Sequence, residues 1–129
     1  MISGNGTITG FASAVQLGNS GAVAVERIHA TANTFAGVIA GDMATVGNCK
    51  IIGNAVGRNQ TGIFTSEGAL VVNNVSRNNR SYGIAMDCPG AAIANTTSNN
   101  LGDNFHQVGG NCDPTLGDCC VVNEHNSTL

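Results

Sequence analysis

The sequence predicts an all-β protein built as a stack of about four to five short coils, and three observations support this fold class. Apolar residues make up 42% of the 129 residues while aromatic residues make up only 4%, so the core must consist mainly of Val, Ile and Ala. Such β-branched material favours strands. Hydrophobicity alternates in short pieces and never holds a helical stripe over two turns. Similar segments recur about every 22 residues, which is typical of a repeat protein.

Two sequence markers define the repeat. The first is a small residue followed by a β-branched residue, and it occurs at Ala14-Val15, Gly37-Val38, Gly62-Ile63 and Gly83-Ile84, with Phe105 near the place of a fifth. The second is an asparagine that precedes most of these pairs, at Asn33, Asn59, Asn78 and Asn100. Because both markers keep a similar interval, residues about 22 positions apart are expected to lie over one another.

Each coil is expected to contain two or three short strands joined by corners. The first coil is the least regular and reads "GTITGFASAVQLGNSGAVAVERIHATAN" from Gly6. The later segments are "GVIAG" from Gly37, "KIIGNAVGRNQTGIF" from Lys50, "LVVNNVSRNNRSYGIAM" from Leu70 and "AAIANTTSNN" from Ala91. Strands this short gain little by pairing within a coil. Each is therefore expected to pair in parallel with the equivalent strand of the next coil, about 4.8 Å away.

Asparagine suits the corners of such a stack for two physical reasons. It tolerates the left-handed backbone of a sharp turn. Its side-chain amide can also form hydrogen bonds with the backbone or with the asparagine of the next coil. The sequence therefore predicts an asparagine ladder along the stack.

These segments resemble the right-handed parallel β-helix proteins of the NosD-like and pectate-lyase-like repeat family. The match covers about residues 6–105 of a single domain spanning 1–129, and it leaves an irregular cysteine-containing tail over 106–129. The resemblance implies the fold but no single activity, since the family includes lyases, hydrolases, epimerases and phage tailspikes. Family members usually have more coils and a helix that covers the first one. We therefore expect this shorter stack to form a homo-oligomer, first of all a trimer as in tailspikes.

Composition argues against two classes of partner. Only 10% of the residues are charged, the net charge is −3, and the five Lys and Arg residues form no run, so nucleic acid is not expected as a partner. No apolar run approaches the roughly 20 residues that a membrane-spanning helix needs. The first residues lack the features of an export signal.

Three acidic residues follow the small/β-branched marker at nearly the same offset and should lie on one outer corner. They are Asp42, Glu67 and Asp87, which we name the acidic corner. Carboxylates in adjacent coils would be about 5 Å apart, within the range that glycosidases use for an acid and a nucleophile or base. The same oxygens could bind Ca²⁺, and no other cofactor is expected. The simpler interpretation, which we favour, is that acidic residues keep an exposed corner soluble.

Arg58 and Arg77 occupy equivalent positions, each directly before an asparagine of the second marker. Such a pair could hold the carboxylate of a uronate sugar, as the resemblance to pectate lyases suggests, although exposed like charges often have no binding role.

His106 falls on the strand position that follows the expected fifth marker, close to Tyr82. A lone histidine on a strand is more often structural than catalytic.

The cysteines allow more than one pairing. Cys88 and Cys112 are about one coil apart and could form a disulfide. Alternatively Cys112 could pair with Cys119 or Cys120 and hold the tail to the last coil. A zinc site made by Cys112, Cys119, Cys120 and His125 is less favoured because the spacing matches no common pattern, and no metal site is expected. Cys49 is expected to be a buried apolar residue. Disulfides would indicate an extracellular or surface location, which conflicts with the missing export signal.

Two classes of function remain. The first is a non-catalytic structural or interaction module, an oligomeric β-helix that binds carbohydrate or protein. The second is a polysaccharide-acting enzyme, a lyase or a glycoside hydrolase, that uses the acidic corner. We favour the first, because catalysis on this scaffold normally needs long loops that wall a groove, and the connections between these strands are short.

Overall fold

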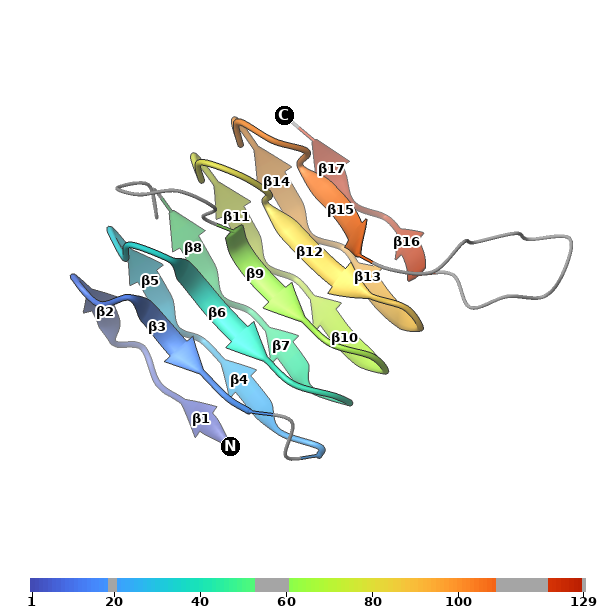
Figure 1. Ribbon diagram of the computed structural model, residues 1–129, viewed down its shortest axis with the longest axis horizontal. Coiled ribbons are helices and arrows are strands. Elements are labelled where there is room, and N and C mark those ends of the chain that lie inside the picture. The colour runs from blue at the N-terminus through green and yellow to red at the C-terminus, as the bar shows by residue number, and fades with distance from the viewer. Residues whose placement is uncertain (19–20, 53–60, 109–120, 129) are drawn as a thin grey trace, which may run out of the picture.

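The computed structural model describes residues 1–18, 21–52, 61–108 and 121–128. In these ranges the chain forms 17 strands and no helix. The strands belong to three parallel sheets, and each turn of the chain contributes one strand to each sheet (Figure 1). The predicted all-β parallel solenoid is confirmed.

The strand order in every sheet advances by three, as expected for a solenoid. Sheet A contains β1 (Ile2–Ser3), β4 (Ala24–Glu26), β7 (Thr45–Gly47), β10 (Ala69–Val72), β13 (Gly90–Ile93) and β16 (Val121–Glu124). Sheet B contains β2 (Thr7–Thr9), β5 (His29–Thr31), β8 (Lys50–Ile52), β11 (Val75–Arg77), β14 (Thr96–Ser98) and β17 (Ser127–Thr128). Sheet C contains β3 (Ser13–Gln16), β6 (Ala36–Ala40), β9 (Thr61–Thr65), β12 (Ile84–Asp87) and β15 (Phe105–Val108).

The predicted register is also confirmed. On sheet C, Val15 pairs with Val38, Val38 with Ile63, Ile63 with Ile84, and Ile84 with Phe105. These are the residues of the first sequence marker. Since sheet C has five strands, the described chain completes five turns.

Part of the predicted tail continues the solenoid. Strand β16 pairs in parallel with β13 on sheet A, and β17 pairs with β14 on sheet B. Residues 109–120, which precede β16 in the chain, lie outside the described residues.

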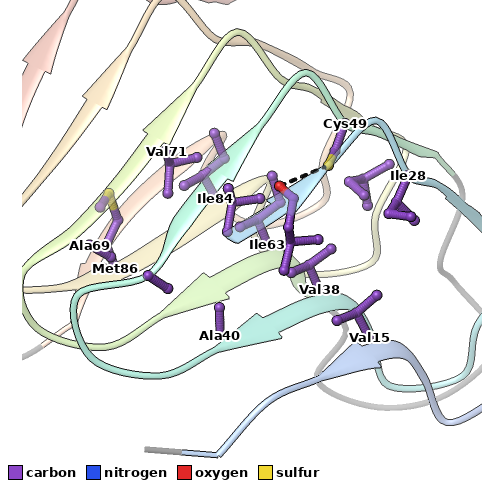
Figure 2. Packing of buried hydrophobic residues seen from close by; sticks show 14 of the residues in the cluster. Val15, Ile28, Val38, Ala40, Cys49, Ile63, Ala69, Val71, Ile84 and Met86 are labelled. Atoms are coloured by element: carbon purple, nitrogen blue, oxygen red, sulfur yellow. Dashed lines mark hydrogen bonds between the residues drawn. The ribbon is translucent and has the colours of Figure 1, made fainter. Parts of the chain in front are cut away.

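The core is narrow and filled by small or β-branched side chains from all three sheets. Val46 and Val71 on sheet A, Ile51 on sheet B, and Ile63 and Ile84 on sheet C are almost fully buried. Figure 2 shows several of these side chains converging between the sheets. Because so few aromatic residues are available, the interior is built from the Val, Ile and Ala residues that composition predicted.

Corners between the sheets are made by residues with left-handed backbone, as the sequence predicted for asparagine. Between sheets A and B these residues are Arg27, Asn48, Asn73, Ala94 and His125. Between sheets B and C they are Gly10, Ala32, Asn78 and Asn99. Between sheets C and A they are Gly21, Met43 and Gly68.

Two asparagine ladders run along the corners, each one residue after a left-handed position. At the corner between sheets A and B, the side-chain oxygen of Asn95 accepts a hydrogen bond from the backbone N–H of Asn74 at 3.0 Å. Asn126 does the same for the backbone N–H of Asn95 at 2.6 Å. At the corner between sheets B and C, Asn100 accepts from the backbone N–H of Asn79 at 3.0 Å. The predicted ladder is therefore present, and it is doubled.

The ladder corrects one detail of the sequence interpretation. The second marker assigned both the turn and the ladder to Asn78, but the structure divides these roles between neighbours. Asn78 has the left-handed backbone and is exposed, while Asn79 is 1% exposed and forms the ladder bonds. Asn33 and Asn100 are ladder residues as expected, and Asn59 lies outside the described residues.

Candidate functional site

The acidic corner lies where the chain passes from sheet C to sheet A. Asp42 follows β6, Glu67 follows β9, and Asp87 ends β12. The pairing of Ala40 with Thr65, extended by two residues, sets Asp42 level with Glu67 in the next coil. Asp87 lies one position earlier in its own coil, because Met86 pairs with Thr65. Two carboxylates are thus in register and the third is offset along the chain.

A shallow hollow at this corner is lined by Asp42, Met43, Glu67, Gly68 and Pro89. Partial burial, and secondarily the charge of Asp42, raise the pKa of the Asp87 carboxyl above its ordinary value. A carboxyl with a raised pKa beside a second acidic side chain is an arrangement that acid–base catalysis can use. No three His, Cys, Asp or Glu side chains gather closely enough to hold a metal ion in the part of the chain described.

The two arginines predicted as a binding pair do not share this corner. Arg77 is exposed at the end of β11 on sheet B, level with Ile52 in one neighbouring coil and Ser98 in the other. Arg58 lies outside the described residues. Sheet B and the acidic corner are on opposite sides of the three-sided coil. Arg77 and these carboxylates therefore cannot bind the same sugar unit.

Cysteines occupy two different environments. Cys88 is buried and disulfide-bonded. Cys49 is a free thiol, 2% exposed, and lies among core side chains as expected. Burial above all raises the pKa of the Cys49 thiol, so the neutral form is favoured. Cys112, Cys119 and Cys120 lie outside the described residues, so the predicted pairings and the zinc alternative that includes His125 stay predictions.

A second hollow, which the sequence analysis did not find, opens on the outer side of sheet C. It is lined by Phe35, Ala36, Ile39, Thr61 and Phe64, and we name it the aromatic hollow. Ile39 on β6 pairs with Phe64 on β9, so their side chains are neighbours on this outer side. Phe35 precedes β6 and remains 48% exposed. Thr61 contributes the only polar side chain among the five lining residues.

Another exposed phenylalanine lies one coil away from this hollow. Phe11 is 60% exposed, and its backbone oxygen accepts a hydrogen bond from the N–H of Thr34, the residue before Phe35. Three of the four phenylalanines in the chain are therefore in or beside the aromatic hollow. Large apolar side chains exposed together usually mark a surface that binds something.

The same side of sheet C carries a stacked aromatic pair farther along the axis. The rings of Tyr82 and His106 lie 4.0 Å apart between centroids and are nearly parallel. Nδ1 of His106 is 3.4 Å from a carboxylate oxygen of Asp103. His106 pairs with Ala85, which in turn pairs with Phe64, so one row of residues connects this cluster with the aromatic hollow. The expected proximity of His106 and Tyr82 is confirmed.

Comparison with known proteins adds no relative. No protein-family model, no curated protein and no solved structure matches the chain. Any assignment of function therefore has to rest on the fold and the local geometry.

Among the described residues there is no helix long and apolar enough to cross a membrane.

A faint signal for the aromatic hollow does exist in the sequence. The residue after the first marker points outward on sheet C, and in two consecutive coils it is large and apolar, Ile39 and then Phe64. In the other coils the paired positions hold Gln16, Ala85 and His106. The signal is weak because Phe35 belongs to a corner and does not follow the repeat.

Proposed function

We propose that this chain is a non-catalytic interaction module that binds a partner protein through the aromatic hollow. The observation that carries the proposal is the clustering of Phe35, Ile39 and Phe64 on the outer side of sheet C, in a chain with very few aromatic residues. Apolar side chains in a preformed hollow favour an apolar or aromatic anchor residue on the partner.

Protein fits this hollow better than carbohydrate does. A sugar presents hydroxyl groups that need hydrogen-bond donors and acceptors, and leaving them unpaired in a binding site is unfavourable. Thr61 supplies the only polar side chain of the lining. The carbon-rich lining instead suits a phenylalanine, leucine or similar side chain at the centre of a protein interface.

The proposal can be tested with N-acetyl-phenylalanine amide as the probe and methyl-labelled protein observed by NMR. We expect the probe to shift the methyl signals of Ile39 and Thr61, because both line the aromatic hollow. Phe64→Ala should remove these shifts while the protein remains folded. Met43→Ala is the matched control, since Met43 is an exposed apolar residue at the corner between sheets C and A and does not line the aromatic hollow.

Two results would overturn the proposal. The first is that the probe leaves the Ile39 and Thr61 signals unchanged at millimolar concentration. The second is that neutral or acidic oligosaccharides shift these signals more strongly than the aromatic probe, in which case carbohydrate is the ligand class.

The module is further proposed to work as a homo-oligomer, with a trimer as the first expectation. A short solenoid presents surface that a second copy can cover. Sedimentation of the wild-type protein tests the homo-oligomer, and a monomer at micromolar concentration excludes it.

The disulfide at Cys88 supports an extracellular or surface location, because disulfides persist in oxidising compartments.

One observation favours the enzyme as a second candidate. The raised pKa of Asp87 beside Asp42 is consistent with a lyase or glycoside hydrolase of the kind that the resemblance to pectate-lyase-like proteins suggests. Cleavage of a polysaccharide panel, with and without Ca²⁺, tests this candidate. Turnover that disappears in both Asp42→Ala and Glu67→Ala would establish it, and absence of turnover on the whole panel would exclude it for those substrates.

A further inference from the structure

Positive charges gather on one side of the solenoid. Arg27 makes a corner between sheets A and B, Lys50 and Arg77 lie on sheet B, and Arg80 follows the corner between sheets B and C. All four side chains are exposed, and we name them the basic face. No Asp or Glu occurs in any strand of sheet B.

Three carboxylates gather on the opposite side, whereas Glu26 at the end of β4 and Asp103 before β15 lie at the corners that border sheet B. Each turn of the chain runs through sheets A, B and C in that order, so the corner between C and A faces away from sheet B. That corner is the acidic corner, with Asp42, Glu67 and Asp87. In Figure 1 the strands of sheet B lie toward the upper left and the connections from sheet C to sheet A toward the lower right.

The two charged surfaces also match in height along the solenoid axis. Arg27, Lys50 and Arg77 belong to three successive turns, those of β5, β8 and β11. Asp42, Glu67 and Asp87 belong to the same three turns, at the ends of β6, β9 and β12. Each of these turns therefore offers a cation on one side and a carboxylate on the other.

These charges cannot satisfy one another within a single copy, because the body of the solenoid separates them. Within the described ranges, the ion pair of the chain is His106 with Asp103, which includes none of the residues in either surface. Mixed charges are the usual state of a protein surface, and segregated charges create complementary patches that steer association. A second copy placed beside the first would bring a basic face against an acidic corner.

We propose that copies of this chain associate side by side, with parallel axes, through contact of the basic face with the acidic corner. This inference rests on the proposed homo-oligomer and assigns its interface. The contact joins two different surfaces, so repeated contacts produce a closed ring or an open array. It leaves the outer side of sheet C uncovered, and the aromatic hollow remains accessible to a different protein.

The test uses charge reversal on exposed positions, followed by sedimentation velocity at low salt. Lys50→Glu with Arg77→Glu reverses the basic face, and Asp42→Lys with Glu67→Lys reverses the acidic corner. Each double variant should weaken self-association by about tenfold or more. A variant with all four substitutions has both signs exchanged and should associate again. Wild-type association should also weaken in about 1 M NaCl, where the Debye length is about 3 Å.

Gln16→Glu is the matched control, because Gln16 is exposed on sheet C and belongs to neither charged surface. It changes the net charge and should leave association unchanged. Thermal melts of all variants confirm that they are folded. If the wild type associates but the double variants associate equally well, the assigned interface is wrong and the homo-oligomer stands. A folded variant with all four substitutions that stays monomeric also overturns the assignment, and a monomeric wild type overturns both proposals.

Discussion

At the scale of single residues, pairs of neighbours divide the work of each corner. The first residue of a pair has the left-handed backbone and faces solvent, as Asn73 does. The second points inward, as Asn74 does, and its amide bridges coils. The side-chain oxygen of Asn74 accepts from the backbone N–H of Cys49 at 2.8 Å, and its Nδ2 donates to the backbone oxygen of Val46 at 2.9 Å. Buried backbone groups at the corner are satisfied in this way.

Replacing a ladder asparagine should therefore be costly. Asn74→Ala leaves a buried backbone N–H and a buried carbonyl oxygen without this partner, and we expect a loss of about 2–4 kcal/mol in unfolding free energy. Urea unfolding monitored by circular dichroism measures it. The control is Asn73→Gly, since glycine accepts the left-handed backbone and should change stability by less than about 0.5 kcal/mol. Equal effects of the two substitutions would contradict the division of roles.

Cys49 occupies the ladder position of its own coil without being an asparagine. Its thiol lies within hydrogen-bonding distance of two backbone oxygens, that of Gly47 at 3.3 Å and that of Val25 at 3.7 Å, and Figure 2 marks the second of these contacts. The asparagines at equivalent positions reach the corresponding oxygens at shorter distances, 2.9 Å for Asn95 to Val71. Cys49→Asn should extend the ladder by one coil and raise the unfolding free energy by about 1 kcal/mol. Cys49→Ala should lower it, and a loss in both variants would show that the site cannot hold an amide.

At the scale of elements, small residues at the start of the sheet C strands keep these short parallel strands in register. Gly62 and Gly83 precede the buried isoleucines of β9 and β12. A Cβ atom on Gly62 would lie 2.6 Å from the backbone oxygen of Gly83 and would also collide with the hydroxyl of Ser76. That hydroxyl donates to the same Gly83 oxygen at 2.6 Å. At these two positions the glycine of the first sequence marker is therefore required by close approach of neighbouring coils.

Gly62→Ala should consequently disturb the contact between two coils. We expect it to lower the unfolding free energy by about 3 kcal/mol, because backbone atoms cannot move aside without breaking the ladder. Thermal and urea unfolding both report this loss. Gly6→Ala is the control, since a Cβ there meets no atom within 4 Å, and its effect should stay within about 0.5 kcal/mol. A tolerated Gly62→Ala would mean that the coils can separate locally.

The acidic corner makes stability depend on pH in a defined direction. The pKa of Asp87 is raised in the folded protein, first by burial and then by Asp42, so folding favours its protonated form. Its ionisation therefore destabilises the folded state as pH rises through the unfolded and folded pKa values. Asp87→Asn should raise the melting temperature at neutral pH, and the gain should vanish below the ordinary pKa of aspartate, about 4. Melting curves across this pH range test it, and a gain that persists at low pH would assign it to another cause.

At the scale of the whole molecule, stability depends on contacts between successive coils. Ile63 is fully buried in the middle turn and pairs with Val38 on one side and Ile84 on the other. A solenoid has few contacts between distant turns, so a weakened central turn affects the connection between the two halves. The three sheets enclose one continuous core that spans these turns.

Ile63→Ala should therefore reduce the unfolding free energy by about 2–4 kcal/mol through the cavity that it leaves. Hydrogen exchange of the neighbouring strands β6 and β12 should become faster. Leu101→Ala is the control, because Leu101 is 80% exposed and its truncation should change stability by less than about 0.5 kcal/mol. Exchange that accelerates only within β9 would show that the turns are less coupled than the continuous core indicates.

The sequence alone determined the repeat, the parallel stacking and the register of the core-facing row from Val15 to Phe105. These features follow from local chemistry, since strand-forming triplets, small residues and turn-forming asparagines recur at one interval. The offset of the three acids from the marker was also readable, because each lies at or just after the end of a strand of sheet C.

Only the tertiary structure decided which asparagine faces inward, because a shift of one residue at a corner exchanges buried and exposed side chains. It also decided that Phe35 and Phe64 share a hollow and that the cations and carboxylates lie on opposite sides. These arrangements join residues from different turns and different sheets. They depend on the angles and lengths of the corners, which the repeat interval does not encode.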